Sequence, residues 1–137
     1  MTIADTSGLL ALFNVREPSH REIASFVEDL ASPLVVSPYV VAELDYLVAT
    51  RMGVDAELQV LRELSGGAYD LIEFGANDLA SCVEIIDQYR DQEIGMTDAS
   101  LVVLADRYET NSILTLDQRH FGVLRPINGG YFDLPKT

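Results

Sequence analysis

Four acidic residues occupy positions where carboxylates could do chemistry. They are Asp5, Glu43, Asp98 and Asp117. Asp5 and Asp117 each follow a short apolar stretch that predicts a β-strand, and open α/β sheets place their ligand sites at the carboxyl ends of parallel strands. If the two strands are neighbours, both carboxylates project from one edge and repel each other unless a cation neutralises them. Asp5 taken alone is equally well explained as a helix cap.

Glu43 lies on the apolar side of a helix predicted over residues 38–52. At about 100° per residue it falls inside a broad apolar arc, between Tyr39 and Leu47. A carboxylate on the buried side of a helix is costly unless a partner compensates it. That partner could be a tyrosine hydroxyl or a buried arginine, or the carboxylate could belong to a functional site. Asp45 falls on the opposite strip of the same helix, and we expect it to face water.

Asp98 lies in the first turn of a helix predicted from Thr97 to about Glu109. Acidic residues are favoured at this position by the helix dipole, so the position alone indicates little. Asp98 also continues the apolar stripe of Leu101 and Val102, which predicts that its side chain points inward. It therefore counts as a fourth inward acid.

The charge balance narrows the chemistry that these acids could do. The 137 residues include 22 acidic and 9 basic ones, giving a formal net charge of −13, and Lys136 is the only lysine. The acidic excess argues against broad, non-specific nucleic-acid binding and suits a divalent cation or a basic partner. Four inward carboxylates without an internal lysine, and with few His and Cys, favour Mg²⁺ or Mn²⁺ over zinc. The expected chemistry is hydrolysis of a phosphoester or phosphodiester, in which the metal activates a water.

Short strands alternating with helices must position the acids. Strands are predicted at residues 2–4, 34–36, 69–74 and 112–116, with a possible edge strand at 131–134 and an irregular stretch between 118 and 130. Helices are predicted from about residue 6, over 18–31, over 38–52, from 55 to about 65, from 77 and over 97–109. This alternation indicates an α/β fold with a mainly parallel sheet covered on both faces. The helices at about 38–65 should form a hairpin.

The length of the chain predicts a single domain over residues 1–137. No apolar run approaches the roughly 20 residues that a membrane span needs, and no signal peptide precedes the first strand. The single cysteine, Cys82, gives no reason to invoke an oxidising compartment. We therefore expect a cytoplasmic protein that does not contact membranes.

Four short motifs resemble those of the PIN-domain ribonucleases. They are Asp5-Thr6-Ser7, Val41-Ala42-Glu43-Leu44, Thr97-Asp98-Ala99 and Leu114-Thr115-Leu116-Asp117-Gln118-Arg119-His120-Phe121. Within that family the chain is most similar to the VapC toxins of type II toxin–antitoxin systems. The motifs occur in order and at family spacing over essentially the whole chain, so their specificity comes from all four together. The resemblance implies a PIN-like α/β/α sandwich.

The resemblance also implies an activity and partners. It implies an endoribonuclease that depends on Mg²⁺ or Mn²⁺, cuts structured RNA such as a tRNA or rRNA stem–loop, and usually forms a homodimer. A VapB-type antitoxin would neutralise it by laying a C-terminal segment across the site. Catalytic and metal-binding roles carry over to the four acids named above. Thr6, Thr97 and Arg119 would support these acids or bind phosphate, although the stretch around Arg119 is often more basic in the family.

Two other interpretations remain open at this point. The chain could be a PIN fold that has lost catalysis and only binds its partner. It could also be a haloacid-dehalogenase-type phosphatase, which likewise begins with an aspartate at a strand end. That mechanism needs a second aspartate two residues later, where this chain has Ser7, and a lysine that it lacks. A metal-dependent ribonuclease assay separates the three.

Overall fold

A sheet of four parallel strands forms the centre of the computed structural model, which describes all 137 residues. The strands are β1 (Thr2–Ala4), β2 (Leu34–Val36), β3 (Asp70–Leu71) and β4 (Ile113–Leu114), in the spatial order β3-β2-β1-β4. Ile3 of β1 pairs with Val35 on one side and Ile113 on the other, and all three are fully buried. The mainly parallel sheet is therefore confirmed.

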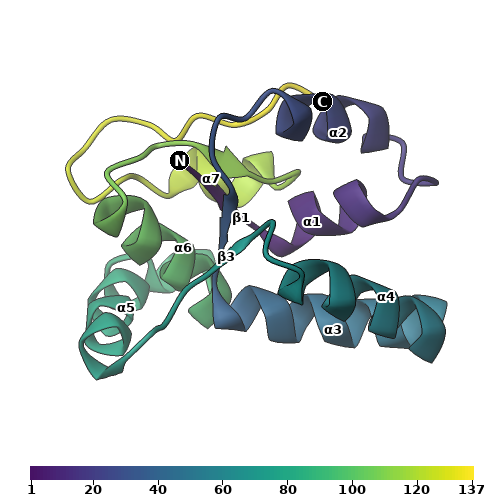
Figure 1. Cartoon of the computed structure of the whole chain (residues 1–137). Coiled ribbons are helices and arrows are strands. Elements are labelled where there is room, and N and C mark those ends of the chain that lie inside the picture. Colours follow the sequence, from purple (N-terminus) through teal and green to yellow (C-terminus); the bar gives the residue numbers. More distant parts are fainter.

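Helices cover both faces of this sheet. They are α1 (Thr6–Phe13), α2 (His20–Glu28), α3 (Pro38–Met52), α4 (Val54–Ser65), α5 (Ala76–Gln88), the 3₁₀ helix η1 (Arg90–Gln92), α6 (Met96–Arg107) and α7 (Gln118–Val123). Figure 1 shows α1 to α4 on one side of the strands and α5 and α6 on the other. This arrangement is the α/β/α sandwich that the motifs implied. No helix is long and apolar enough to cross a membrane.

The predicted hairpin of α3 and α4 begins and turns at residues suited to those places. The Ser37 hydroxyl accepts a hydrogen bond from the Tyr39 amide at 3.1 Å, and Pro38 occupies the first turn, where its missing N–H costs nothing. Gly53 alone separates the two helices, with φ of +92°, a conformation that residues with a Cβ rarely adopt. The hairpin thus follows from local sequence.

Helix α1 passes unusually close to β4 at Gly8. A Cβ atom at residue 8 would lie 2.2 Å from the Leu114 carbonyl oxygen, so only glycine permits this approach. The Asp5 amide, just before α1, donates to the same Leu114 oxygen at 2.9 Å. These contacts fix the start of α1 against the end of β4.

Several predicted elements are shorter than the sequence suggested. The helix predicted over 18–31 covers only His20–Glu28, and the strands predicted at 69–74 and 112–116 retain two residues each. The predicted edge strand at 131–134 is reduced to one parallel bridge between Ser112 and Asp133. Apolar side chains beyond the short strands pack on helices instead; Phe74, for example, packs edge-on against Tyr39. Apolar patterning therefore marked burial correctly but overstated sheet pairing.

Candidate active site

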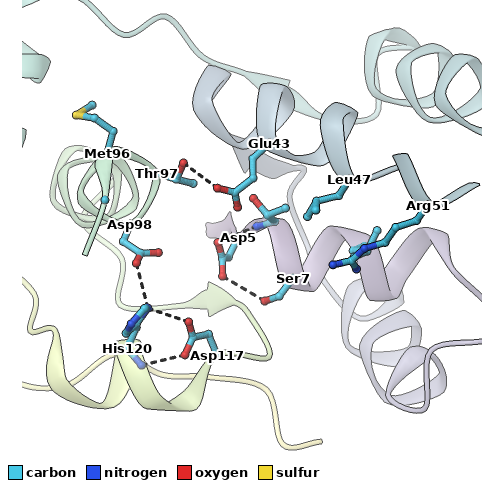
Figure 2. Close-up of a pocket in the computed structure, with 13 residues that line it drawn as sticks. Asp5, Ser7, Glu43, Leu47, Arg51, Met96, Thr97, Asp98, Asp117 and His120 are labelled. Atoms are coloured by element: carbon cyan, nitrogen blue, oxygen red, sulfur yellow. Dashed lines mark hydrogen bonds and ion pairs between the residues drawn. The ribbon is translucent and has the colours of Figure 1, made fainter. Parts of the chain in front are cut away.

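The four predicted acids line one open cavity at the carboxyl edge of the sheet. Its volume is about 570 Å³. Asp5 follows β1 directly, Asp117 comes three residues after β4, Glu43 lies in α3, and Asp98 lies in the first turn of α6. Figure 2 shows the four carboxyl groups around the same space. Four elements that are distant in sequence thus bring their acids together.

Asp5 is the most enclosed of these acids, and the residue is only 6% exposed. The Thr115 hydroxyl donates to its Oδ2 at 2.7 Å, the Ser7 hydroxyl to Oδ2 at 3.2 Å, and the Thr6 amide to Oδ1 at 2.8 Å. Burial raises the pKa of Asp5, the three hydrogen bonds oppose that rise, and the nearby charge of Glu43 adds to it. The carboxylate is therefore held in one orientation.

Two hydroxyls that the sequence analysis did not single out connect the ends of β1 and β4. Besides its bond to Asp5, the Thr115 hydroxyl accepts from the Asp117 amide at 2.9 Å. The Ser7 hydroxyl accepts from the Leu116 amide at 2.9 Å. Thr115 could have been noticed as the one polar residue in the otherwise apolar stretch 113–116. Through it, Asp5 and the backbone of Asp117 share a single hydrogen-bonding group.

His120 joins the two acids on the other side of the cavity. Its Nδ1 lies 3.2 Å from Oδ2 of Asp98 and 3.0 Å from Oδ2 of Asp117. Burial raises the pKa of Asp98 to about 6, with the charge of Asp5 adding to the rise and His120 opposing it. No function had been predicted for His120. It lies between the two carboxylates on this side of the cavity.

Glu43 reaches the cavity from the open side of α3. It is exposed, and its one hydrogen bond comes from the Thr97 hydroxyl, at 3.4 Å from Oε2. No tyrosine hydroxyl or arginine holds it, so the structural explanation offered by the sequence is not found. Thr97 therefore lies close enough to Glu43 to orient its carboxylate.

Asp45 contradicts the expectation that it faces water. It is half-buried, and its Oδ1 atom is enclosed without a hydrogen-bond partner. It contacts Glu57 of α4, and that contact is the main cause of a raised pKa at Glu57. The expectation was wrong because α4 packs on the strip of α3 that a single-helix projection assigns to solvent.

Arg119, which was predicted to support the acids or bind phosphate, lies in α7. It is exposed and does not line the cavity, whereas Arg51, at the end of α3, does. Thr6 lines the cavity as predicted; its hydroxyl oxygen is buried and has no partner within the chain. The cavity therefore contains an unused oxygen donor and a cationic group that had not been predicted.

The donor set suits a hard cation, although the side chains are not gathered into a cage. No group of three or more His, Cys, Asp and Glu side chains is arranged to hold a metal ion in this structure. The available donors are carboxylate and hydroxyl oxygens in an open cavity. Mg²⁺ prefers such oxygens and keeps several waters, so one or two carboxylates suffice to bind it. The residues present are thus compatible with a divalent metal.

Comparison with known proteins identifies the family. The model of the PIN domain family matches residues 2–124. Ribonuclease VapC26 of Mycobacterium tuberculosis is 60% identical over 130 residues, which cover 95% of this chain and 96% of that protein. The chain therefore belongs to the PIN-domain family and, within it, to the VapC ribonucleases. Ribonucleases with this domain generally use divalent metal ions. The phosphatase interpretation is excluded.

Solved structures share the fold at low sequence identity. VapC20 of Mycobacterium tuberculosis, a sarcin–ricin loop cleaving toxin, superposes with a TM-score of 0.85 at 15% identity, over 99% of this chain and 100% of that one. VapBC2 of Rickettsia felis, bound to a DNA fragment from its promoter, has a TM-score of 0.69 at 16% identity, over 97% and 96%. These similarities concern the fold alone.

Proposed function

We propose that this ribonuclease is the toxin of a type II toxin–antitoxin system and a metal-dependent endoribonuclease that cuts folded RNA. The observation that carries the proposal is the convergence of Asp5, Glu43, Asp98 and Asp117 on one open cavity. Four carboxylates in one place repel each other, and a bound cation relieves that repulsion. The positive charge of that cation is also what phosphodiester hydrolysis requires, because charge develops on the phosphate during the reaction.

Mg²⁺ or Mn²⁺ would be held by Asp5, Asp98 and Asp117, and by Glu43 from the open side of the cavity. When bound, the metal supplies a Lewis acid that activates water and stabilises charge on the phosphate. Its preference for oxygen ligands agrees with the donors in the cavity.

The chain's own groups would keep these acids in position. Thr115 and Ser7 fix the orientation of Asp5 through hydrogen bonds of 2.7 and 3.2 Å, and Thr97 lies against Glu43. The buried, unpartnered hydroxyl of Thr6 offers a further oxygen next to Asp5. Outer hydrogen bonds of this kind orient metal ligands and are worth about 10–100-fold in metal affinity or activity.

The proposed substrate is a structured RNA such as a tRNA or rRNA stem–loop. One structural neighbour is described as a sarcin–ricin loop cleaving toxin, which makes that stem–loop a first RNA to try. The proposed partner is a VapB-type antitoxin, since neighbours include VapBC assemblies from Rickettsia felis and Salmonella typhimurium. A homodimer is also proposed. Tyr46 of α3 is 67% exposed, which leaves an aromatic side chain available for a protein contact.

Chelation is the direct test of the activity. The purified chain should cut the sarcin–ricin stem–loop or a tRNA in Mg²⁺ or Mn²⁺, lose that activity in EDTA, and regain it when the metal is restored. The reason is that the acids cannot share the cavity with an RNA phosphate unless a cation offsets their charge. Gel analysis of end-labelled RNA measures the cleavage. Activity that persists in EDTA would contradict the metal mechanism.

The interpretation as a binding module that has lost catalysis makes the opposite prediction. Such a protein would bind its partner without cutting any RNA under any metal condition. Co-expression with the product of the adjacent gene, followed by copurification and light scattering, tests the antitoxin and the dimer separately from catalysis. If the chain stays monomeric and captures no antitoxin, the proposal of a nuclease stands and the proposal of a toxin with an antitoxin partner fails.

A further inference from the structure

We propose that Arg51 is the residue that binds an RNA phosphate flanking the one that is cut; this rests on the proposed function and assigns a substrate contact within the same cavity. Besides the four acids, the cavity is lined by two groups that can carry positive charge, Arg51 and His120. His120 is already engaged by Asp98 and Asp117. Arg51 makes no hydrogen bond or ion pair within the chain, so its guanidinium is free.

The position of Arg51 follows from the geometry of α3. Glu43, Leu47 and Arg51 are spaced four residues apart, so they share one face of the helix, and all three line the cavity. Eight residues of α-helix span about 12 Å, which separates the backbone of Arg51 from that of Glu43. Figure 2 shows the Arg51 side chain reaching from α3 towards the cavity. It therefore lies beside the acids rather than among them.

The charge of the molecule explains why a group at this place matters. The chain carries a net charge of −13, and a metal at the acids would neutralise only the point of cleavage. The phosphates on either side would face a strongly negative protein. An arginine offers a planar fork of donors that matches phosphate oxygens in two parallel hydrogen bonds. Arg51 would hold the neighbouring phosphate without help from the metal.

The placement also predicts which kinetic constant depends on Arg51. A flanking phosphate does not change during the reaction, so its contact is equally strong in the ground state and in the transition state. Loss of such a contact raises KM and leaves kcat nearly unchanged. A metal ligand behaves differently, because its loss lowers kcat. The split between KM and kcat therefore distinguishes Arg51 from the acids.

The experiment compares Arg51→Ala with Arg62→Ala, using cleavage of the sarcin–ricin stem–loop RNA or of the RNA that the activity assay identifies. Arg62 is an exposed residue of α4 whose side chain makes no hydrogen bond or ion pair and lies outside the cavity. Both variants remove one positive charge, so only position differs. Arg51→Ala should raise KM about tenfold, as for loss of a charge-assisted hydrogen bond. Arg51→Lys should recover part of the loss, and Arg62→Ala should match the wild type.

A second measurement locates the phosphate. Each phosphate near the cut is replaced in turn by a neutral methylphosphonate. At one flanking position the substitution should raise KM as much as Arg51→Ala does, and combining the two should add nothing more, since both remove the same contact. The salt dependence of RNA binding, measured in an inactive Asp5→Asn background, should also weaken by about 0.7 in log–log slope.

The outcomes separate the inference from the function on which it rests. If the wild type cuts RNA and Arg51→Ala behaves like Arg62→Ala, or the effects add at every methylphosphonate position, the Arg51 assignment fails alone. If the wild type neither cuts nor binds folded RNA, the proposed function fails and the assignment fails with it. Thermal melting checks that both variants remain folded, which the absence of side-chain hydrogen bonds and ion pairs at both residues predicts.

Discussion

Helix α3 carries two acids, two residues apart, that meet opposite surroundings. Glu43 opens onto the cavity, where other carboxylates share the space with hydroxyl donors, His120 and solvent. Asp45 lies against Glu57 in the packed hairpin, with one oxygen enclosed and unpartnered. Both places crowd acids together, yet only the first leaves room for a cation and a substrate. Crowded carboxylates can form a functional site where space for a cation remains. Where no such space remains, their repulsion only lowers the stability of the folded protein.

Helix geometry produces this contrast. Two residues along an α-helix are separated by about 200° around its axis, so Glu43 and Asp45 cannot face the same neighbour. One side of α3 looks onto the carboxyl edge of the sheet, and another side contacts α4. A change at one acid should therefore affect catalysis, and a change at the other should affect only the hairpin.

The largest expected effect compares Glu43→Gln with Asp45→Asn. Glu43→Gln should lower the cleavage rate by more than about a hundredfold, since even the outer partners of metal ligands are worth about 10–100-fold. Asp45→Asn should leave the rate within about twofold and the metal-free stability equal or slightly higher, because an amide can donate to Glu57 where a carboxylate repels it. Single-turnover cleavage and denaturant melts measure the two quantities. Equal loss of activity in both variants would show that the hairpin, rather than the cavity, is the sensitive region.

A smaller effect is expected at the hydroxyl that orients Asp5. Thr115→Val keeps the shape of the side chain but removes the donor to Asp5, and it should reduce activity about 10–100-fold. Thr2→Val is the matched control, since Thr2 is also buried in the sheet region and its hydroxyl lies 2.9 Å from that of Ser112, at the opposite edge. Both variants should lose about 1 kcal/mol of stability for the hydrogen bond. If Thr2→Val impairs cleavage as strongly, the contribution of Thr115 is general stability rather than orientation.

The smallest effect concerns pH and the metal-free protein. The pKa of Asp98 is raised to about 6 in the folded state, above its value in an unfolded chain, so the folded state binds this proton more tightly. The stability that Asp98 contributes is therefore greatest at low pH and is lost as pH rises through 6, by about 1 kcal/mol between about pH 5 and pH 7. Asp98→Asn should remove that part of the decline, whereas Asp45→Asn should not. Urea unfolding in EDTA at the two pH values tests it; an unchanged decline in Asp98→Asn would contradict the assignment.

A site residue could be predicted from the sequence where the neighbouring residues alone determine the orientation of its side chain. Asp5 and Asp117 were found because each follows a short buried strand, a feature visible in the chain itself. Helix α7 was not predicted. Because residues 118–123 are helical, Arg119 is exposed outside the cavity lining, and the next residue, His120, lines the cavity beside the acids. A six-residue helix leaves too short a pattern to detect.

Tertiary packing accounts for the other failures. Glu43 was singled out for lying among apolar neighbours, yet it is exposed, because the side of α3 that carries it borders an open cavity. The opposite error at Asp45 has the same origin, since the position of α4 is not contained in the pattern of α3. The cavity itself was predictable only as a meeting of strand ends. The Thr115 hydroxyl bonds to residues at the ends of both β1 and β4. Its role could be predicted only from the register of these two strands, which the sequence does not provide.

The close approach of α1 to β4 has a consequence for how the protein can change. With a hydrogen atom as the side chain of residue 8, the separation between α1 and the end of β4 is set by contact between two backbones. Substitutions in the cavity wall can alter its charge and shape, while backbone pairing of β1 with β4 holds the two strand ends together. The helix that follows Asp5 is therefore fixed to the strand that precedes Asp117 by main-chain contacts at a residue outside the cavity lining.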